Sequence, residues 1–546
     1  MNKAGAISPL QALLFLSLFL SLPVSLGLFL GIKFIKRTSG LLIKLKENER
    51  SIIAFLLMLL LFLPSIATKN AAATVIFVLI YLFILSFLLP TLFMGSFKKI
   101  LFKHNISTFD FLKIDRNIFD NMELKKDAGA LIGYSMKRFE PIYLDKNTRE
   151  KHTLISGSTG SGKTTMLKSL FIDAMINDDP VLIIDPKGNI ETINEFQMLA
   201  NKYSQRSRIV EVFSLISPEN SLSYNPLKRG NPVQIKDRLI SSLEWSEQYY
   251  KNQAAAWVGK VVQIFDALDM EISIPLINKI LIDRKFAEEI ELKIKGLKDK
   301  NLAKVVHEQL NRALKVDPQK LDNLIAQISD LNNKETGFLL EKTSSNQEID
   351  LLDAIKGRRI IYFQLNTMAY DLTARALGRL ILADLKSLAS EIHGGKVGMK
   401  PTFFPIFVDE FGSFCSSSFI EMLKMCRDVK FSLHLFFQSL ADLDVVSKEF
   451  KSQVQQNCIN KFILRTDDPD EVDFWASVAG TSRSNEESFQ YKKTLGFNIK
   501  TGMGNSRSTR EMKIEHDVFK QLEVGQSVFI QKSPSKEDLI QLWYPQ

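Results

Sequence analysis

A short glycine-rich segment carries the most specific chemical pattern in this chain of 546 residues. Residues 157–164 read Gly-Ser-Thr-Gly-Ser-Gly-Lys-Thr and match the pattern GxxxxGK[ST]. The glycines let backbone N–H groups wrap around a polyphosphate at the N-terminus of a helix. We expect Lys163 to reach the β- and γ-phosphates and Thr164 to bind Mg²⁺. The predicted nucleotide-binding residues are Gly157, Ser158, Thr159, Gly160, Ser161, Gly162, Lys163, Thr164 and Thr165.

A second chemical pattern is an acidic pair, Asp409 and Glu410, at the end of an apolar run over residues 403–408. A Mg²⁺-dependent hydrolase needs such carboxylates beside the phosphates. Asp409 would hold Mg²⁺ through water, and Glu410 would orient or deprotonate the attacking water. An acidic pair after a strand is a weak signal alone, but it gains weight from the phosphate-binding pattern that precedes it.

Three further polar residues are placed at the ends of predicted elements. Gln438 ends the apolar run after the acidic pair, so it either senses the γ-phosphate or simply caps a strand. Arg427 lies at the end of a predicted helix, where it is either an arginine finger for a neighbouring subunit or a salt-bridge residue. Asp185 is another carboxylate at the end of a predicted strand.

Short apolar runs alternate with helical patterns over most of the chain after residue 150. Strands that are apolar on both faces and separated by helices indicate a mainly parallel α/β sheet covered on both sides. The predicted strands span residues 153–156, 180–185, 209–213, 359–365, 403–409, 432–438, 461–464, 526–531 and 539–543. Residues 494–510 are predicted to form an exposed loop or hairpin.

One interval, residues 230–353, has helical periodicity and almost no strand signal. It is too long for a simple connection, which favours an inserted all-helical subdomain. Five lysines between residues 293 and 304 either contact nucleic acid or form a solvated helix face. The predicted organisation is a membrane anchor at 1–97, a connector and start of the motor domain at 98–150, nucleotide-binding parts at 151–229 and 354–546, and the insertion at 230–353.

The first hundred residues contain three apolar runs, at 7–35, 52–67 and 71–94. The first is longer than the core of a cleavable signal peptide and predicts an uncleaved anchor. The second is short for a full span, so two helices remain an alternative to three. Basic residues at 33–50 and 98–103 place those loops, and the remainder of the chain, in the cytoplasm.

The net charge and the cysteine content limit which binding partners and metal sites the chain is expected to have. The net charge of +9 fits either a phosphate-bearing partner or the basic loops of a membrane protein. The three cysteines, Cys415, Cys426 and Cys458, form no CxxC pair, which argues against a disulfide framework or a thiolate metal site.

The order of these motifs resembles the type IV secretion coupling proteins of the TraD/TraG class, which are RecA-like hexameric ATPases related to the FtsK family. The resemblance covers about residues 150–546 and the membrane part only in general design. Three elements besides the phosphate loop and acidic pair make it more specific. They are Asp185-Pro186-Lys187-Gly188, Tyr224-Asn225-Pro226-Leu227 and Phe437-Gln438-Ser439, with Thr466-Asp467-Asp468 following a strand.

This resemblance implies an α/β RecA-like fold, ATP and Mg²⁺ as cofactors, and a homohexamer in the bacterial inner membrane. It implies nucleotide contacts at Lys163 and Thr164, catalysis at Asp409 and Glu410, sensing at Gln438 and a finger in trans at Arg427. The implied substrate is single-stranded DNA with an attached relaxase-type protein, passed to the channel of a type IV secretion or conjugation system. The apparent third span and the lack of a long acidic tail depart from the family pattern.

Two other functions remain open from the sequence. The chain could be a receptor for protein effectors only, with the helical insertion as the recognition module. It could also be an FtsK-like translocase of double-stranded DNA, although no winged-helix pattern follows the last predicted strand. An ABC transporter is disfavoured because no LSGGQ-like stretch occurs in the motor region.

Overall fold

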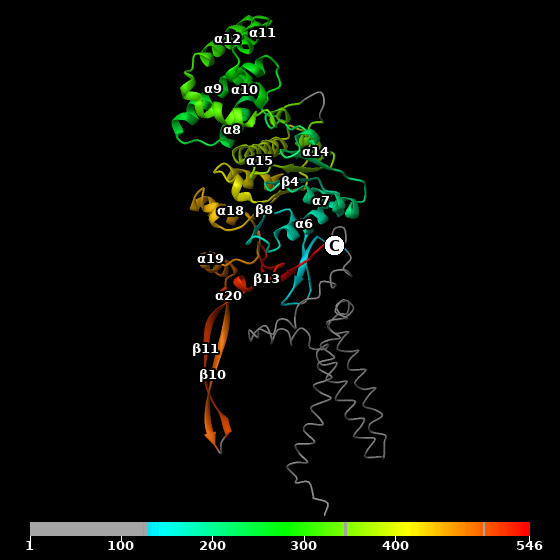
Figure 1. Ribbon diagram of the computed structural model, residues 1–546. Coiled ribbons are helices and arrows are strands. Elements are labelled where there is room, and N and C mark those ends of the chain that lie inside the picture. Colours follow the sequence, from blue (N-terminus) through cyan, green and yellow to red (C-terminus); the bar gives the residue numbers. More distant parts are fainter. Residues whose placement is uncertain (1–123, 125–128, 139, 343–346, 495–496, 546) are drawn as a thin grey trace, which may run out of the picture.

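The computed structural model describes residue 124 and residues 129–138, 140–342, 347–494 and 497–545 (Figure 1). The predicted membrane spans fall outside these residues. Within the described part of the chain, no helix is both long and apolar enough to cross a bilayer.

Eleven strands form one sheet in the order β2-β1-β13-β12-β9-β3-β8-β7-β4-β6-β5. The seven strands from β9 to β5 run parallel, and the other four pair antiparallel at one side. The strands are β1 (Ala130–Ser135), β2 (Pro141–Leu144), β3 (Thr153–Ser156), β4 (Val181–Asp185), β5 (Val210–Ser214), β6 (Ile360–Gln364), β7 (Phe404–Val408), β8 (Phe431–Phe437), β9 (Asn460–Ile463), β12 (Gln526–Lys532) and β13 (Ser535–Leu542). The predicted mainly parallel α/β sheet is confirmed.

The strand pairs β1–β2 and β12–β13 extend the parallel part of the sheet. β1 pairs with β13, which lies more than 400 residues later in the chain. The sequence predicts a polar connector and the start of the motor domain at residues 98–150, and β1 and β2 have no counterpart among the predicted strands. Pairing between segments this far apart leaves no local periodicity, so the sequence did not reveal it.

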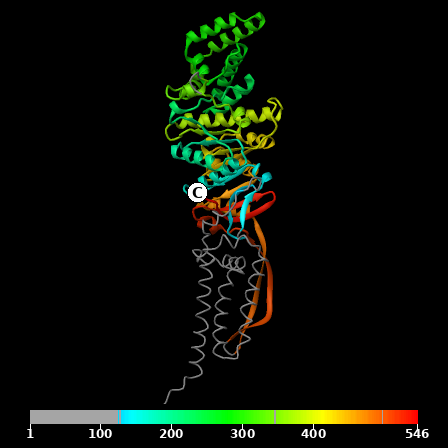
Figure 2. The ribbon, with the colours of Figure 1, turned by 90° about the vertical axis from the view of Figure 1, so that its right-hand side faces the viewer.

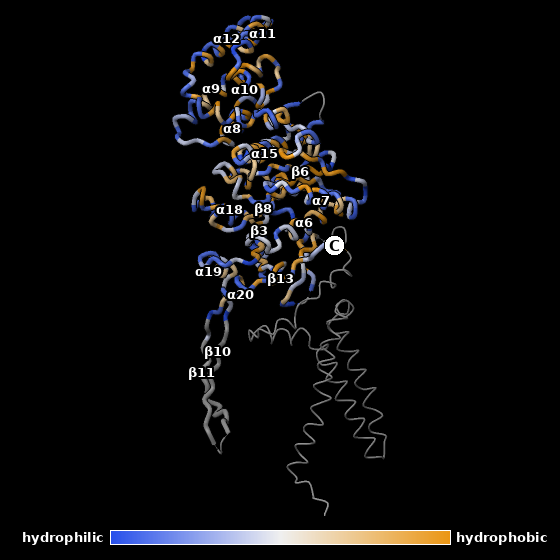
Figure 3. The backbone as a smooth tube through the Cα atoms, viewed as in Figure 1, coloured by the Kyte–Doolittle hydropathy of each residue, from blue (hydrophilic) through white to orange (hydrophobic). Residues whose placement is uncertain are grey.

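Two apolar layers cover the two faces of the sheet, because successive side chains of a strand point to opposite faces. Ile155 packs in the cluster that contains α6 (Lys163–Ile176) and α7 (Ile190–Tyr203). Leu154 packs on the other face, in the cluster of α15 (Asp371–His393) and α16 (Phe419–Asp428). Figure 3 shows hydrophobic colour around β6, whereas α15 alternates between hydrophobic and hydrophilic colours. The parallel strands are therefore buried on both faces.

Helices fill the chain between β5 and β6 and form the end of the molecule far from β13 (Figure 1). Their bounds are α8 (Pro232–Ser242), α9 (Gln248–Ala267), α10 (Ile274–Ile282), α11 (Arg284–Lys295), α12 (Lys300–Leu314), α13 (Asp322–Leu331) and α14 (Leu351–Lys356). An isolated β-bridge joins Ser223 to Glu348 where the chain leaves and re-enters the sheet region.

A buried polar cluster ties α8 to α15 and gives the Tyr224-Asn225-Pro226-Leu227 segment a structural task. The Tyr224 hydroxyl donates a hydrogen bond of 2.8 Å to Asp384 of α15. Arg238 of α8 pairs with the same carboxylate at 2.9 Å and donates to the carbonyl of Pro226. All three side chains are buried. The segment therefore anchors the first helix of the insertion to the motor domain.

A long two-stranded ribbon projects from the sheet region on the side away from the helical insertion (Figures 1 and 2). It consists of β10 (Thr481–Thr494) and β11 (Phe497–Met512), which pair antiparallel with each other. The ribbon is rooted between α19 (Pro469–Ala479) and α20 (His516–Gln521). Its first strand begins 13 residues before the predicted loop or hairpin, because a largely polar strand lacks the apolar alternation that would reveal it.

Candidate nucleotide site

The glycine-rich loop follows β3, in the middle of the sheet, and leads directly into α6. Its start is anchored by backbone hydrogen bonds from Gly157 to Phe437 and from Ser158 to Arg465. Gly160 and Gly162 have φ angles of +76° and +117°, in the left-handed region that favours glycine. The loop therefore has the strand–loop–helix context that phosphate binding requires.

The Lys163 ammonium folds back onto this loop. It donates hydrogen bonds of 2.6 Å to the Gly157 carbonyl and 3.2 Å to the Ser158 carbonyl. Burial lowers the pKa of Lys163, and nearby Asp409 and Glu410 oppose that shift. The Thr164 side chain is exposed in the first turn of α6. A bound phosphate group would thus replace the two carbonyl oxygens as the hydrogen-bond acceptor of Lys163. The exposed Thr164 side chain would be accessible to it.

The acidic pair lies at the carboxyl end of β7, on the same edge of the sheet. The Asp409 amide donates to the Ile184 carbonyl at 3.0 Å, and the Glu410 amide donates to Asp409 Oδ1 at 3.0 Å. Glu410 has a φ of +44°, which turns the chain sharply after the strand. Burial raises the pKa of Asp409, with Asp185 adding to that effect and Lys187 opposing it.

Gln438 connects the loop to the acidic pair. Its Nε2 donates to Glu410 Oε1 at 3.1 Å, and its Oε1 accepts from the Thr159 hydroxyl at 3.5 Å. The Asp442 carboxylate accepts from the Gln438 amide at 3.1 Å and holds the turn after β8. Gln438 therefore does more than end a strand, since it links the two halves of the site.

Lys187 is a member of the site for which the sequence suggested no role. Its ammonium pairs with Glu410 Oε1 at 3.0 Å and with Asp409 Oδ2 at 3.4 Å. Partial burial raises the pKa of Glu410, but the hydrogen bonds from Lys187 and Gln438 outweigh it, so the pKa lies below its usual value. The only signal in the sequence was that Lys187 closely follows a predicted strand, and the structure was needed to show that this strand, β4, neighbours β7.

Arg427 is the predicted site residue that the fold keeps away from the others. It is exposed near the end of α16, just before β8 begins at Phe431. Gln438 follows the other end of β8, so the whole strand separates Arg427 from the nucleotide edge. In its own subunit Arg427 does not contribute to this site, so its two expected roles, a finger for a neighbouring subunit or a salt-bridge residue, both stay predictions.

The donor atoms of the site suit magnesium. Mg²⁺ prefers oxygen ligands and usually takes one or two protein groups, with phosphates and water completing its shell. The Thr164 hydroxyl and the Asp409 carboxylate are such groups. Within the described residues no cluster of three or more His, Cys, Asp or Glu could hold a metal by protein ligands alone. The donor set therefore fits a metal that arrives with the nucleotide.

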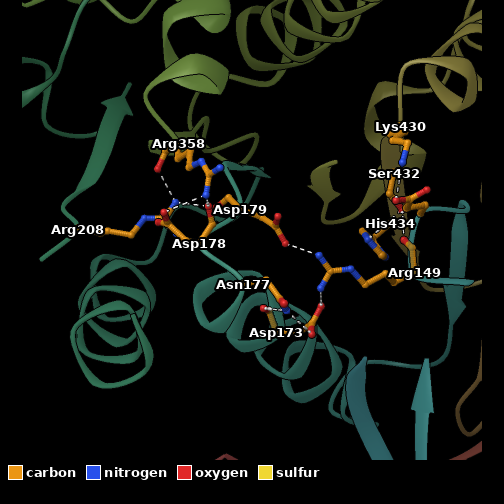
Figure 4. A network of polar contacts seen from close by, with 11 residues as sticks. Arg149, Asp173, Asn177, Asp178, Asp179, Arg208, Arg358, Lys430, Ser432 and His434 are labelled. Carbon is orange, nitrogen blue, oxygen red and sulfur yellow. Dashed lines mark hydrogen bonds and ion pairs between the residues drawn. The ribbon is translucent and has the colours of Figure 1, made fainter. Parts of the chain in front are cut away.

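A second charged network lies at the opposite edge of the sheet (Figure 4). The Arg149 guanidinium pairs with Asp173 and Asp179, each at 2.5 Å, and lies over the Phe403 ring at 4.2 Å. The Ser432 hydroxyl donates to the Arg149 carbonyl at 2.9 Å. These contacts join the starts of β3, β4 and β8, so the network has a structural role.

The arrangement of strands defines the class of the domain. The loop-bearing β3 and the acid-bearing β7 are separated by β8, which carries Gln438 at its carboxyl end. A phosphate loop, an acidic pair and a polar sensor on three adjacent parallel strands are typical of a RecA-like P-loop NTPase. The described residues thus form a P-loop NTPase domain with a helical insertion.

Comparison with known families agrees with this class and narrows it. Residues 128–384 match the family model of the helicase HerA central domain, and residues 404–526 match that of the TraM recognition site of TraD and TraG. The type 4 coupling protein DotL of Legionella pneumophila is 23% identical over 423 residues. That match covers 67% of this chain and 54% of DotL, so the chain spans about half the length of this relative. The chain's resemblance to the type IV secretion coupling proteins is confirmed.

Solved structures of the conjugative coupling protein TrwB share the fold. The unbound form of TrwB lacking its N-terminal region aligns with a TM-score of 0.51, at 13% identity, over 77% of this chain and 90% of TrwB. TrwB in complex with a non-hydrolysable GTP analogue gives a TM-score of 0.51, at 13% identity, over 78% and 91% of the two chains.

Proposed function

We propose that this protein is a coupling ATPase that uses ATP hydrolysis to bring single-stranded DNA, with an attached relaxase-type protein, to a type IV secretion channel. One observation carries the catalytic part of the proposal: Gln438 joins Thr159 of the phosphate loop to Glu410 of the acidic pair. This contact lets the catalytic carboxylate respond to the phosphate loop. The DNA part is supported by the resemblance to coupling proteins.

Each residue of the site has a defined task in this proposal. Lys163 leaves the loop carbonyls to bind the phosphates, and the backbone amides around Gly160 and Gly162 bind them as well. Thr164 would hold Mg²⁺ directly and Asp409 would hold it through water, and the ion would supply positive charge beside the phosphoryl oxygens. Glu410 orients the attacking water and takes its proton, and Gln438 keeps this carboxylate aligned.

The cellular setting is proposed on the same basis. The apolar runs before residue 95 would anchor the protein in the bacterial inner membrane, with the motor domain in the cytoplasm. Six copies would form a ring in which Arg427 reaches the nucleotide of a neighbouring subunit. The ring would hold DNA by basic side chains without reading its sequence.

A second candidate is a receptor for protein substrates, which the surface of the insertion favours. Helices α10, α11 and α12 expose large apolar side chains. Among these are Ile282, Leu292 and Val305, one from each helix and each more than half accessible. DNA backbones attract cationic side chains, whereas exposed apolar groups bind protein surfaces. In this case the same ATPase would act on proteins delivered through the insertion.

ATP hydrolysis measured with and without single-stranded DNA tests the proposal. We expect DNA to stimulate the rate severalfold and high salt to abolish that stimulation, because phosphate contacts release counterions. Lys163→Ala should abolish hydrolysis with or without DNA. Hydrolysis that depends on Lys163 but ignores DNA, in a protein that assembles, would contradict DNA transport and favour the protein receptor.

A further inference from the structure

The turn after β4 delivers a lysine to the acidic pair. β4 and β7 are adjacent and parallel, so Asp185 and Asp409 end neighbouring strands on the same edge of the sheet. Two residues past Asp185, Lys187 crosses to the neighbouring strand and pairs with both Glu410 and Asp409. Among the residues that the structure describes, the side-chain ion pairs of Asp409 and Glu410 therefore both come from one lysine outside the phosphate loop.

The backbone of this turn is fixed, whereas the lysine side chain is accessible. Asp185 Oδ1 accepts from the Lys187 amide at 2.8 Å, and Asp185 Oδ2 accepts from the Tyr362 hydroxyl at 2.6 Å. The Gly188 carbonyl accepts from Gln364 at 2.9 Å. The Lys187 side chain is nevertheless 52% exposed. A fixed base with an exposed flexible stem lets the ammonium leave the carboxylates without rearranging the fold.

Release of Lys187 would leave the acidic pair without its compensating cation. Asp409 is largely buried next to Asp185 and Glu410, so its charge needs a compensating cation. Lys163 directs its ammonium to the Gly157 and Ser158 carbonyls. Lys187 therefore supplies the cation at the oxygens that a Mg²⁺ ion needs. The Glu410 amide occupies Asp409 Oδ1 and Lys187 pairs with Oδ2, so the ammonium and a hydrated divalent cation would compete for the same carboxylate.

We propose that Lys187 is a latch that competes with Mg²⁺ for Asp409 and holds Glu410 until metal and nucleotide bind. This inference rests on the proposed function in one respect, the role of Asp409 in binding Mg²⁺. The latch keeps the acidic pair neutralised and aligned before the metal enters. Lys187 is thus a positioning residue that sets the metal affinity of the site.

Binding of Mn²⁺ to the protein saturated with a non-hydrolysable ATP analogue, followed by electron paramagnetic resonance, tests the latch without relying on turnover. Lys187→Ala should tighten Mn²⁺ binding about two- to fivefold, the range expected when a partly exposed ion pair no longer competes. Lys187→Arg keeps the charge and should bind Mn²⁺ as the unaltered protein does. Asp409→Asn should weaken this analogue-dependent Mn²⁺ binding in both backgrounds. Unchanged or weaker Mn²⁺ binding in Lys187→Ala, or equal behaviour of the Ala and Arg variants, overturns the latch.

Lys386→Ala is the matched control. Lys386 also pairs with a glutamate, Glu421 at 2.5 Å, but on the α15–α16 surface. Its substitution should leave Mn²⁺ affinity unchanged, and a shift equal to that of Lys187→Ala would overturn the latch as a local effect. Fluorescent ATP binding, measured in parallel with Lys163→Ala, separates the two proposals. ATP binding that is absent, or that persists in Lys163→Ala, would reject the ATPase. ATP binding that depends on Lys163, together with an unaltered Mn²⁺ affinity in Lys187→Ala, would reject only the latch.

Discussion

At the scale of single residues, the site is organised around one carboxylate. Glu410 receives a hydrogen bond from Gln438 at 3.1 Å and forms an ion pair with Lys187 at 3.0 Å, while its backbone adopts a left-handed conformation. A left-handed backbone is unfavourable for glutamate, and these two contacts offset that conformational cost. The same contacts hold the pKa of Glu410 below its usual value, so the residue is a ready carboxylate. Its position and charge state both suit a group that orients water.

Substitution of this residue gives a direct test. Glu410→Gln keeps the size of the side chain and its hydrogen bond to Gln438 but removes the proton acceptor. We expect the turnover number to fall about 10²- to 10⁴-fold, with nucleotide affinity changed little. Steady-state hydrolysis and fluorescent nucleotide binding measure the two effects. The control Glu421→Gln, on the exposed face of α16, should retain full turnover. Turnover within twofold of normal in Glu410→Gln would refute the assignment.

At the scale of elements, the connection between insertion and motor rests on a buried charge pair. Arg238 of α8 and Asp384 of α15 face each other with side-chain exposures of 1% and 6%. Burial raises the pKa of Asp384, and Arg238 opposes that shift. Such pairs add little net stability when intact, but removing one partner leaves the other charge buried and uncompensated. The junction is therefore sensitive to substitution on either side.

We predict that Arg238→Ala destabilises this junction by about 3–5 kcal/mol, because Asp384 loses its buried cation. Tyr224→Phe removes one hydrogen bond to the same carboxylate and should cost about 1 kcal/mol. Hydrogen exchange of α8 and α15 amides would report both losses. The exposed pair Arg375–Asp371 on α15 offers a control, since Arg375→Ala should change stability by less than about 1 kcal/mol. Equal protection of α8 in all variants would show that the cluster does not join the elements.

At the scale of the whole molecule, the placement of Arg427 bears on assembly. β8 carries Gln438 after its carboxyl end and is preceded by Arg427 near its amino end, so the two residues lie at opposite edges of the sheet. A finger that acts on phosphates therefore has to act on the site of another copy. The hexamer proposed for this protein would supply that copy.

Mixed assemblies would reveal such a contact. Arg427→Ala and Glu410→Gln should each be nearly inactive as uniform assemblies. In a random one-to-one mixture, about a quarter of the sites would combine an intact Glu410 with an intact Arg427 from the neighbour. We expect hydrolysis to recover toward that fraction when the two variants are co-expressed. A mixture as inactive as its components would show that Arg427 does not act between subunits.

The sequence by itself predicted the chemistry of the candidate site and determined the type of its scaffold. The spacing from Gly157 to Thr164 predicted the phosphate loop, and the apolar run before Asp409 predicted the strand that carries the acidic pair. Both signals are local, because a backbone turn and a buried strand are encoded by consecutive residues. The alternation of apolar strands and helices likewise predicted a mainly parallel sheet, which the structure confirms.

Only the tertiary structure decided which of these residues meet. The order of the parallel strands places β4, β7, β8 and β3 side by side, and no local pattern encodes that order. It brings Lys187 to Glu410 across 223 residues of sequence and Gln438 to Thr159 across 279, and it carries Arg427 to the opposite edge. The tertiary structure also pairs β1 with β13 and brings Arg238 to Asp384. Contacts between distant segments depend on the packing of the whole chain, which is why the sequence predicted the candidate reacting groups but not their partners.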